Sequence, residues 1–245
     1  MPTKTPSAKS KVLVQPPLKV VDLHTHTFHS DGDLGPAELA RRAAYNQYLF
    51  LGLCDHCDQS NLSHSLDFSI RAAEKLSGIV GLTLLAGVEI THVPPSQIFG
   101  LVDLARQAGA DFVAVHGESP VEPVASGTNL AAIEAKVDFL AHPGIITEKE
   151  VKLAAKLGVR LELSARGGHC LGNGLVAKLA LEYGAPLLIG SDTHDPEDLL
   201  TPALAMKVAM GAGLSYEEYL KLVDNATNLA TVIAGKSGRR LWEDA

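Results

Sequence analysis

Short apolar runs alternate along the chain with longer stretches in which apolar residues recur at helical spacing. None of the runs shows strict alternation of apolar and polar residues, which favours parallel strands covered by helices on both faces. Repeated strand–helix units of this kind predict an α/β fold with a closed or nearly closed parallel barrel. The seven predicted strands span residues 19–24, 49–56, 82–90, 111–117, 137–142, 159–164 and 186–192.

Helix-forming stretches separate and follow these strands. The clearest are residues 35–47, 96–109, 147–158 and 174–184. Several end in glycine, which commonly stops a helix, and Thr147 and Glu150 have the spacing of a capping box. A final pair of helices over about 196–210 and 215–234 is expected to cover the last opening of the barrel.

Length and composition favour one domain. A chain of 245 residues, 46% of them hydrophobic, can bury a large core. We therefore expect a single barrel domain over residues 18–245. Residues 1–17 are rich in Lys, Ser, Thr and Pro and are predicted to form a flexible tail.

Charge and cysteine content restrict the expected partners and location. The formal net charge of −7 argues against an extended nucleic-acid surface. No apolar run reaches membrane-spanning length and no secretory leader opens the chain, so no membrane partner is expected. Three cysteines are too few for a disulfide framework, which favours a cytoplasmic location. The sequence specifies no oligomeric state.

Titratable side chains gather at the carboxyl ends of the predicted strands. In a parallel barrel these ends share one rim, where the following loops build active sites. Imidazoles and carboxylates without convergent thiolates suit Zn, Mn or Fe, and two or three divalent ions would use most of them. The residues are Asp22, His24, His26, Asp55, His56, Glu89, His116, His142, Asp192 and His194.

Some positions within this set have more specific expectations. His24 and His26 share one face of an extended segment with Asp22, which is expected to orient a ligand. Glu89 is our choice for a bridging ligand, because a carboxylate that ends a buried strand is costly unless it is paired or metal-bound. In the loop that follows the first strand, Asp31 and His29 compete for one ligand position.

Arg166 follows the sixth predicted strand, where a guanidinium can hold a phosphate with two hydrogen bonds. A solvated loop arginine fits this spacing equally well. His92 and His169 flank rim positions and have no assigned role.

Taken together, these motifs resemble the PHP family, the polymerase and histidinol phosphatase metal-dependent phosphoesterases. The resemblance covers about residues 20–234 and implies a distorted (β/α)7 TIM-like barrel with three metal ions on its carboxyl rim. The motifs that carry it are DLHTHTFHSDG (22–32), CDHCD (54–58), GVEI (87–90), VHGE (115–118), HPG (142–144) and SDTH (191–194).

The resemblance also implies a ligand set, position by position. A first ion is expected at His24, His26, Glu89 and Asp192, a second at Asp31, His56 and His194, and a third at Glu89, His116 and His142. Arg166 lies in the segment where relatives place residues that contact phosphate.

The implied activity is hydrolysis of a phosphate ester by a metal-bridged hydroxide, with Arg166 offsetting charge on the phosphate oxygens. Asp55 or His194 is expected to pass a proton to the leaving group. The expected partner is a small phosphorylated substrate, a monoester such as histidinol phosphate, because no nucleic-acid module accompanies the barrel.

Three alternatives stay open. A phosphodiesterase or 3′ to 5′ exonuclease would use the same centre. Metal barrels of the amidohydrolase type commonly have a bridging lysine at a strand end, whereas His116 stands at the end of the fourth strand here. A non-enzymatic PHP module would be expected to have lost ligands, and all nine family positions are filled.

Overall fold

The computed structural model describes residues 19–242, whose strands form one eight-stranded sheet. The sheet order is β1-β2-β4-β5-β6-β7-β8, β3 pairs with β4, and every pairing is parallel. The tail predicted over residues 1–17 lies outside the described residues.

Each predicted strand overlaps a strand of the structure. The second overlaps two, because the chain leaves β2 after Leu53 and pairs again with β4 only at His56. The strands are β1 (Val20–Thr25), β2 (Tyr48–Leu53), β3 (His56–Cys57), β4 (Thr83–Ile90), β5 (Phe112–His116), β6 (Phe139–Ala141), β7 (Arg160–Ser164) and β8 (Leu187–Gly190).

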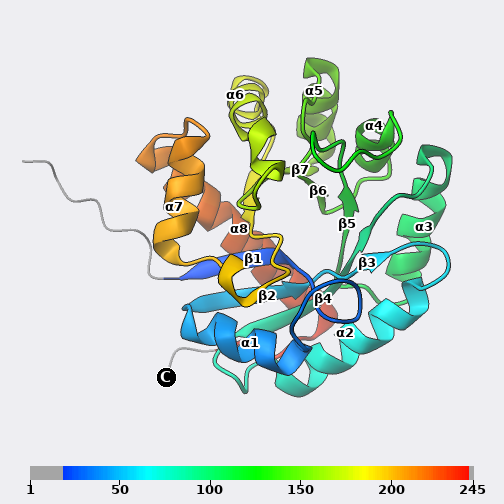
Figure 1. Cartoon of the computed structure of the whole chain (residues 1–245), viewed down its shortest axis with the longest axis vertical. Coiled ribbons are helices and arrows are strands. Elements are labelled where there is room, and N and C mark those ends of the chain that lie inside the picture. The colour runs from blue at the N-terminus through cyan, green and yellow to red at the C-terminus, as the bar shows by residue number, and fades with distance from the viewer. Residues whose placement is uncertain (1–18, 243–245) are drawn as a thin grey trace, which may run out of the picture.

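Helices connect the strands and surround the sheet (Figure 1). They are α1 (Pro36–Tyr45), α2 (Leu62–Leu76), α3 (Pro95–Gln107), α4 (Thr128–Glu134), α5 (Glu148–Leu157), α6 (Asn173–Tyr183), α7 (Pro202–Gly211) and α8 (Tyr216–Ser237), with 3-10 helices η1 (His169–Gly172) and η2 (Pro196–Asp198). The capping box at Thr147 is present. Of these helices, none has the length and apolar character needed to cross a membrane.

The helix expected over about 196–210 is divided in two. η2 ends at Asp198, and α7 starts anew at Pro202, where the Thr201 side chain accepts a hydrogen bond from the Leu204 amide. Proline favours the first turn of a helix because it has no amide to donate, which explains the new start.

The sheet is nearly closed into a barrel where its first and last strands approach. At the carboxyl ends of these strands, the His26 amide donates to the Thr193 carbonyl at 2.9 Å, and the Asp192 amide donates to the His24 carbonyl at 2.9 Å. The distorted TIM-like α/β barrel predicted from the apolar runs and the family resemblance is therefore confirmed.

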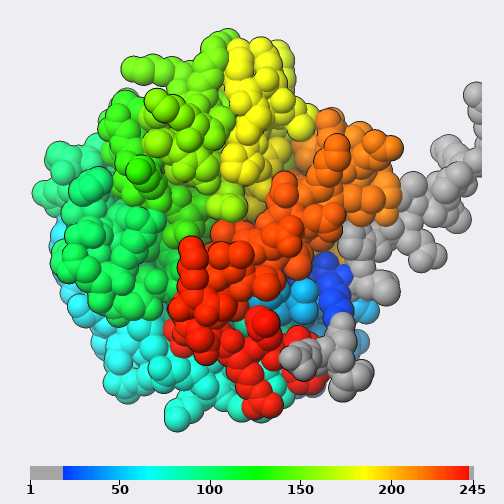
Figure 2. Space-filling view, turned by 180° about the vertical axis from the view of Figure 1, so that it is seen from behind, coloured from blue at the N-terminus to red at the C-terminus, as the bar shows by residue number. Residues whose placement is uncertain are grey.

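Apolar side chains fill the amino-terminal part of the barrel. Phe112 and Phe139 belong to a buried cluster that also contains Leu229 and Ile233 of α8. Beside α8, the Arg239 guanidinium pairs with Asp111, the residue before β5. Figure 2 shows α8 in red across the back of the molecule, next to α7 in orange. α8 therefore covers the end of the barrel opposite the predicted ligands.

Candidate metal centre

The structure brings all nine predicted ligand side chains together at the carboxyl ends of the strands. They form overlapping groups whose ligand atoms lie within 4.8 Å of one another. These groups are His26, Asp31, His56 and His194; His24, His142 and Asp192; His24, His26 and Glu89; and His56, Glu89 and His116. Below, the inner group is His24, Glu89, His142 and Asp192, and the outer group is Asp31, His56 and His194.

Glu89, at the end of β4, lies at the middle of the cluster and is fully buried. Its Oε1 atom is 3.4–3.5 Å from ring nitrogens of His24, His116 and His142. Its Oε2 atom is 3.7 Å from His26 Nε2. The two oxygens of one carboxylate therefore face different sets of imidazoles, which is the arrangement of a bridging ligand.

Many buried ligand atoms of the cluster have no hydrogen-bond partner. They are Nε2 of His24, both ring nitrogens of His26 and His116, Oε1 of Glu89 and Nδ1 of His142; Oε2 of Glu89 also has no hydrogen bond but has an ion-pair contact with His56. An unsatisfied buried polar group costs about 1–3 kcal/mol. A cluster of this many unsatisfied groups therefore indicates that something else binds them.

The spacing of these atoms indicates what binds them. Two nitrogen or oxygen ligands on a single tetrahedral ion lie roughly 3.4 Å apart. The His24 Nε2–Glu89 Oε1 distance is 3.4 Å, and the His26 Nε2–Asp192 Oδ1 distance is 3.3 Å. Donor type, burial and spacing therefore all fit bound divalent cations.

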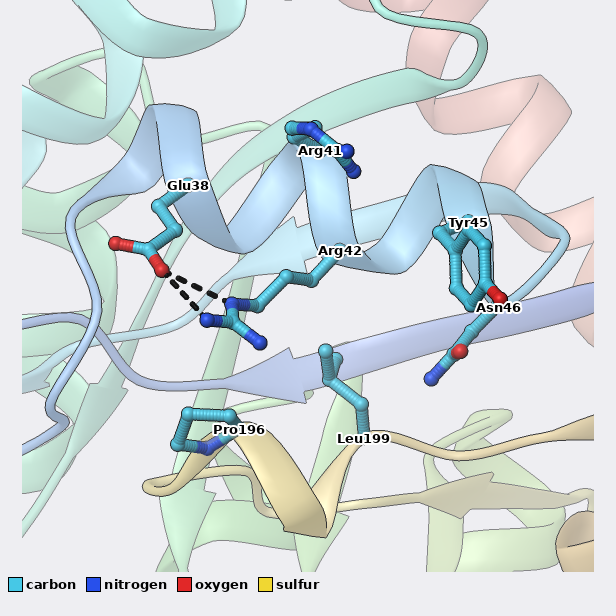
Figure 3. A pocket seen from close by; sticks show the side chains of 7 residues that line it. All are labelled: Glu38, Arg41, Arg42, Tyr45, Asn46, Pro196 and Leu199. Carbon is cyan, nitrogen blue, oxygen red and sulfur yellow. Dashed lines mark hydrogen bonds and ion pairs between the residues drawn. The ribbon is translucent and has the colours of Figure 1, made fainter.

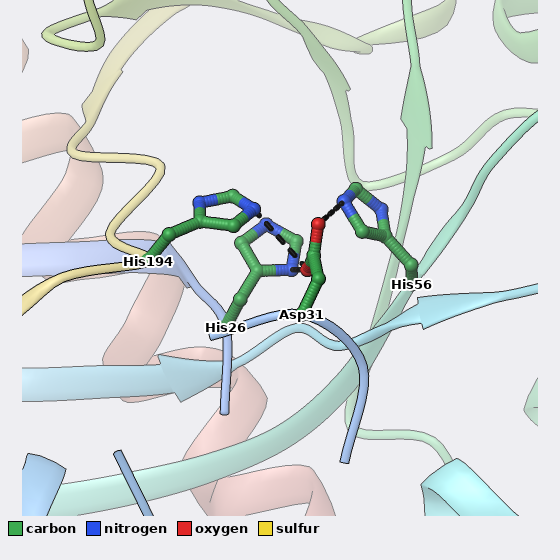
Figure 4. Close-up of side chains that lie close together, drawn as sticks. All are labelled: His26, Asp31, His56 and His194. Carbon is green, nitrogen blue, oxygen red and sulfur yellow. Dashed lines mark ion pairs between the residues drawn. The ribbon is translucent and has the colours of Figure 1, made fainter. Parts of the chain in front are cut away.

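The outer group lies nearer to solvent than the inner group, and Figure 4 shows its three side chains beside His26. Asp31 Oδ1 is 3.2 Å from His194 Nε2, and Asp31 Oδ2 is 3.6 Å from His56 Nε2. His56 Nδ1 lies 2.7 Å from both Glu89 Oε2 and Thr91 Oγ1, and its hydrogen bond is with Thr91. That bond directs Nε2 of His56 towards Asp31.

Asp31 and His29, the two loop candidates for one ligand position, differ in where their side chains lie. The His29 ring stacks on Phe68 with 3.7 Å between ring centroids, away from the other imidazoles. Asp31 faces three of them and has a 54% exposed side chain. Asp31 is therefore the loop residue that the fold offers to the outer group.

Asp55 holds the loop that carries Asp31. Its Oδ1 accepts from the Thr27 amide at 2.6 Å and from the Ser30 hydroxyl at 2.8 Å, and its Oδ2 accepts from the Thr27 hydroxyl at 2.8 Å. Since both oxygens are engaged inside the loop, these contacts favour a role in fixing Asp31 over the predicted proton transfer.

Arg166 lies behind His194. Its Nη1 is 2.7 Å from His194 Nδ1 and 3.1 Å from the Asp192 carbonyl, and it lies 3.5 Å from Asp198 Oδ2. The Asp192 carbonyl, which accepts from Arg166, also lies 2.9 Å from His194 Nδ1, so it can accept the proton of Nδ1 and leave Nε2 of His194 for an ion. In this arrangement Arg166 therefore supports the outer group from the side.

Electrostatics differ sharply between neighbouring imidazoles. Burial lowers the pKa of His26 to about 4, and the adjacent His56 adds to this effect. Burial acts in the same direction on His56, but Glu89 and Asp31 outweigh it and raise the pKa of His56 to about 9. Burial tends to raise the pKa of Glu89, yet His24 and His56 hold it well below its usual range.

Glu162 of β7 was not among the residues predicted from the sequence, although it contacts two of the predicted ligands. Its Oε1 lies 2.7 Å from His24 Nδ1, and its Oε2 accepts from the His142 amide at 2.8 Å. The signal was available, because Glu162 is a carboxylate inside a buried strand, the argument that singled out Glu89.

Asp22 contacts the backbone of the predicted ligand His24 and does not contact its ring. Its Oδ1 accepts from the backbone amides of His24 and Ser191, and its Oδ2 accepts from the Tyr48 hydroxyl. Asp22 therefore holds the backbone of β1 against the segment that follows β8.

A cleft of about 360 Å³ opens beside the outer group and is lined by Asp31, His56, Cys57, Asp58, Asn61, Thr91, His92 and Glu122. Glu122 lies between two histidines, with Oε1 3.4 Å from His92 Nε2 and Oε2 3.7 Å from His169 Nε2. His92 and His169 thus belong to the surroundings of the centre.

Another cleft, of about 550 Å³, lies between α1 and residues 196–199 (Figure 3). Its lining includes Arg42, which donates to Glu38 at 3.0 and 2.8 Å, and the exposed Tyr45. None of the predicted site residues lines it, so the chemistry is assigned to the rim.

Comparisons with known proteins place the chain among several relatives, although no family model matches it. The uncharacterized protein MJ1295 of Methanocaldococcus jannaschii is 42% identical over 199 residues, which is 80% of this chain and 91% of that protein. Ribonuclease P protein component 3 of Methanosarcina mazei is 27% identical over 78% of this chain and 80% of its own length. A probable phosphatase of Thermoanaerobacter sp. is 26% identical over 80% and 87%.

Solved structures share the fold at low sequence identity. A chain of archaeal ribonuclease P with mature tRNA superimposes with a TM-score of 0.65 at 16% identity, over 86% of this chain and 91% of that chain. Histidinol phosphate phosphatase from Lactococcus lactis, complexed with zinc, L-histidinol and phosphate, gives 0.54 at 14% identity, over 79% and 94%.

These findings overturn one expectation from the sequence. We expected a small phosphorylated substrate as the partner and no extended nucleic-acid surface, yet relatives are ribonuclease P components and the fold occurs in a complex with tRNA. Net charge was the ground for excluding a nucleic-acid surface, and that argument fails because a sum over the chain does not describe a local surface.

The sequence similarity to MJ1295 is higher than that to the other two relatives. It amounts to 42% identity over 80% of this chain and 91% of that protein. The chain belongs to the same family as the uncharacterized protein MJ1295 of Methanocaldococcus jannaschii.

Proposed function

We propose that the chain is a metal-dependent phosphoesterase of the PHP type that hydrolyses a phosphate monoester. The observation that carries the proposal is the cluster of unpartnered, buried ligand atoms spaced 3.3–3.7 Å apart around Glu89 and Asp192. A probable phosphatase among the relatives and a zinc-containing histidinol phosphatase of the same fold support it.

Two or three divalent ions would be held by the nine side chains already predicted as ligands. We assign His24, His26, Glu89 and Asp192 to the first ion, Asp31, His56 and His194 to the second, and Glu89, His116 and His142 to the third. Zinc, manganese or iron suits imidazole and carboxylate ligands. Such ions, when bound, lower the pKa of water and offset charge on phosphoryl oxygens.

The residues around the ions position the ester and keep the ligands in place. Arg166 contacts His194 of the outer group, and its side chain is 32% exposed. We propose that it contacts a phosphate oxygen of the substrate, exchanging its 3.5 Å contact with Asp198 for the ester.

His194 has one role in this proposal. Its Nε2 atom faces Asp31 at 3.2 Å. One nitrogen lone pair cannot hold a proton and an ion together, so we place His194 among the ligands and assign it no proton transfer to the leaving group.

The ester need not belong to a small molecule. A phosphate monoester at the end of a nucleic acid presents the same group as one on a metabolite. The ribonuclease P relatives favour a second candidate, in which the barrel binds RNA or an RNA-containing complex without hydrolysis.

Phosphate release tests both candidates. Metal-free protein is reloaded with zinc, manganese or iron and assayed on a panel of metabolite monoesters beside end-phosphorylated RNA and DNA oligonucleotides. Metal-dependent release that is lost in Glu89→Gln supports the proposal. Metal-independent tRNA binding with no hydrolysis of any ester would replace it with the second candidate.

A further inference from the structure

Glu162 reaches two ligands that come from different strands, and both contacts are fully buried. We propose that Glu162 is a positioning residue that sets the tautomer of His24 and the backbone of His142, so that both rings present Nε2 to the bound ions. This inference rests on the proposed metal centre and deepens it.

The first contact determines which nitrogen of His24 is available to an ion. An ionised carboxylate accepts hydrogen bonds and donates none, so the 2.7 Å contact with Glu162 places the proton on His24 Nδ1. The lone pair is then on Nε2, which lies 3.4 Å from Glu89 Oε1 and 3.7 Å from Asp192 Oδ1. A carboxylate behind a histidine ligand is a recurring way to fix ring orientation and basicity.

The second contact supports an unusual backbone. His142 has a φ of 25°, in a region that residues other than glycine rarely occupy. Its amide donates to Glu162 Oε2 at 2.8 Å. In this conformation His142 Nε2 lies 3.5 Å from Glu89 Oε1 and 3.7 Å from Asp192 Oδ2. The same carboxylate therefore holds a ring of β1 and the backbone after β6.

The neighbouring strand leaves room for this arrangement. Gly190 of β8 faces Glu162, and a Cβ atom at position 190 would overlap Glu162 Oε1 and come within 2.9 Å of His24 Cβ. Any side chain at position 190 would push the carboxylate off His24. Strands β1, β7 and β8 thus build the contact together.

Glu162→Gln tests the proposal because the amide has nearly the same shape but carries a donor in place of one acceptor. If the side-chain oxygen of the glutamine still accepts from the His142 amide, its NH₂ group faces His24 Nδ1. That contact favours the tautomer with the proton on Nε2, which then cannot bind an ion. We expect zinc affinity to fall by about 10- to 100-fold. In long-range ¹H–¹⁵N spectra of the zinc-loaded chain, His24 should change from a protonated Nδ1 to a protonated Nε2.

Matched variants separate positioning from folding. Glu162→Asp keeps the charge but cannot reach both partners, so its zinc affinity should also fall, and it replaces Glu162→Gln if that variant does not fold. Asp111→Asn is the control, because Asp111 is a buried carboxylate that accepts from the Ala86 amide at 2.7 Å at the opposite end of the barrel. It should lose stability and keep wild-type zinc affinity.

Each outcome bears on one claim. A wild-type chain that binds no zinc would refute the proposed metal centre itself. A wild-type chain that binds zinc, together with a folded Glu162→Gln variant of unchanged affinity and His24 tautomer, would refute only the positioning role. An equal loss of affinity in Asp111→Asn would also refute it, because general destabilisation would then explain the effect.

Discussion

The inner and outer groups use the same residue types but are held in different ways. Inner side chains are at most 4% exposed and are fixed from neighbouring strands. In the outer group the exposed fractions are 54% for Asp31, 21% for His56 and 11% for His194. The inner ligands are therefore desolvated and oriented before an ion arrives, whereas the outer group depends on a loop.

This difference predicts that ions in the two groups differ in affinity and exchange. A preorganised site loses little conformational entropy when an ion binds, whereas a loop must be ordered each time an ion binds. The inner group should therefore retain its ions during dialysis, and the outer group should exchange them. The variants below test this contrast, from the largest expected effect to the smallest.

Glu89→Gln should have the largest effect, because Glu89 contacts imidazoles on both of its oxygens. We expect a loss of affinity greater than about 100-fold, since even partners that do not touch the ion cost 10- to 100-fold when removed. Elemental analysis after dialysis measures the ratio of ions to chain. Glu118→Gln is the control, because Glu118 accepts from the amides of Gly127 and Asn129 and from no imidazole. An unchanged ratio in Glu89→Gln would refute the shared bridge.

Asp31→Asn should remove an ion from the outer group only. Asp31 is the carboxylate that faces both His56 and His194, whereas the inner ligands have carboxylates of their own. We expect elemental analysis to show partial loss with the inner ions retained. Asp58→Asn, which alters an exposed acid in the same cleft, is the control. Loss of every ion in Asp31→Asn would contradict the division into two groups.

Binding at the outer group should strengthen as the pH rises to about 9. In the metal-free protein His56 keeps its proton up to about pH 9, and an ion must displace it. Affinity should therefore change by about tenfold per pH unit below 9 for this one proton. His26, with its pKa near 4, is neutral throughout and adds no such dependence. Zinc competition titrations between pH 6.5 and 9 measure the slope, and a flat profile would contradict the prediction.

Ser30→Ala should have the smallest effect. It removes the 2.8 Å hydrogen bond to Asp55 in the loop that carries Asp31. One such bond contributes about 1 kcal/mol, so thermal unfolding should shift by only a few degrees. Zinc exchange at the outer group should become faster while the inner ions stay. Faster exchange at the inner group instead would show that the loop supports both.

Much of the site followed from strand ends alone. Parallel strands bring their carboxyl ends to one rim, so residues as distant as His24 and Asp192 were expected to meet before any contact was known. Which of Asp31 and His29 faces the other histidines could not be read from residue spacing, because it depends on the stacking of His29 against Phe68 of α2. Residue spacing along the chain does not specify which two side chains stack in the folded protein.

The sequence by itself determined the parallel barrel, through seven apolar runs separated by helices, and the gathering of histidines and acids on one rim. The tertiary structure alone decided which polar residues face the centre and which hold the backbone. Asp22 and Asp55 look like ligands by position but hold β1 and its loop, while Glu162 stands behind His24 and His142. The physical reason is that each carboxylate is satisfied by whichever donors the folded chain brings within about 3 Å, and those donors come from segments far apart in the sequence.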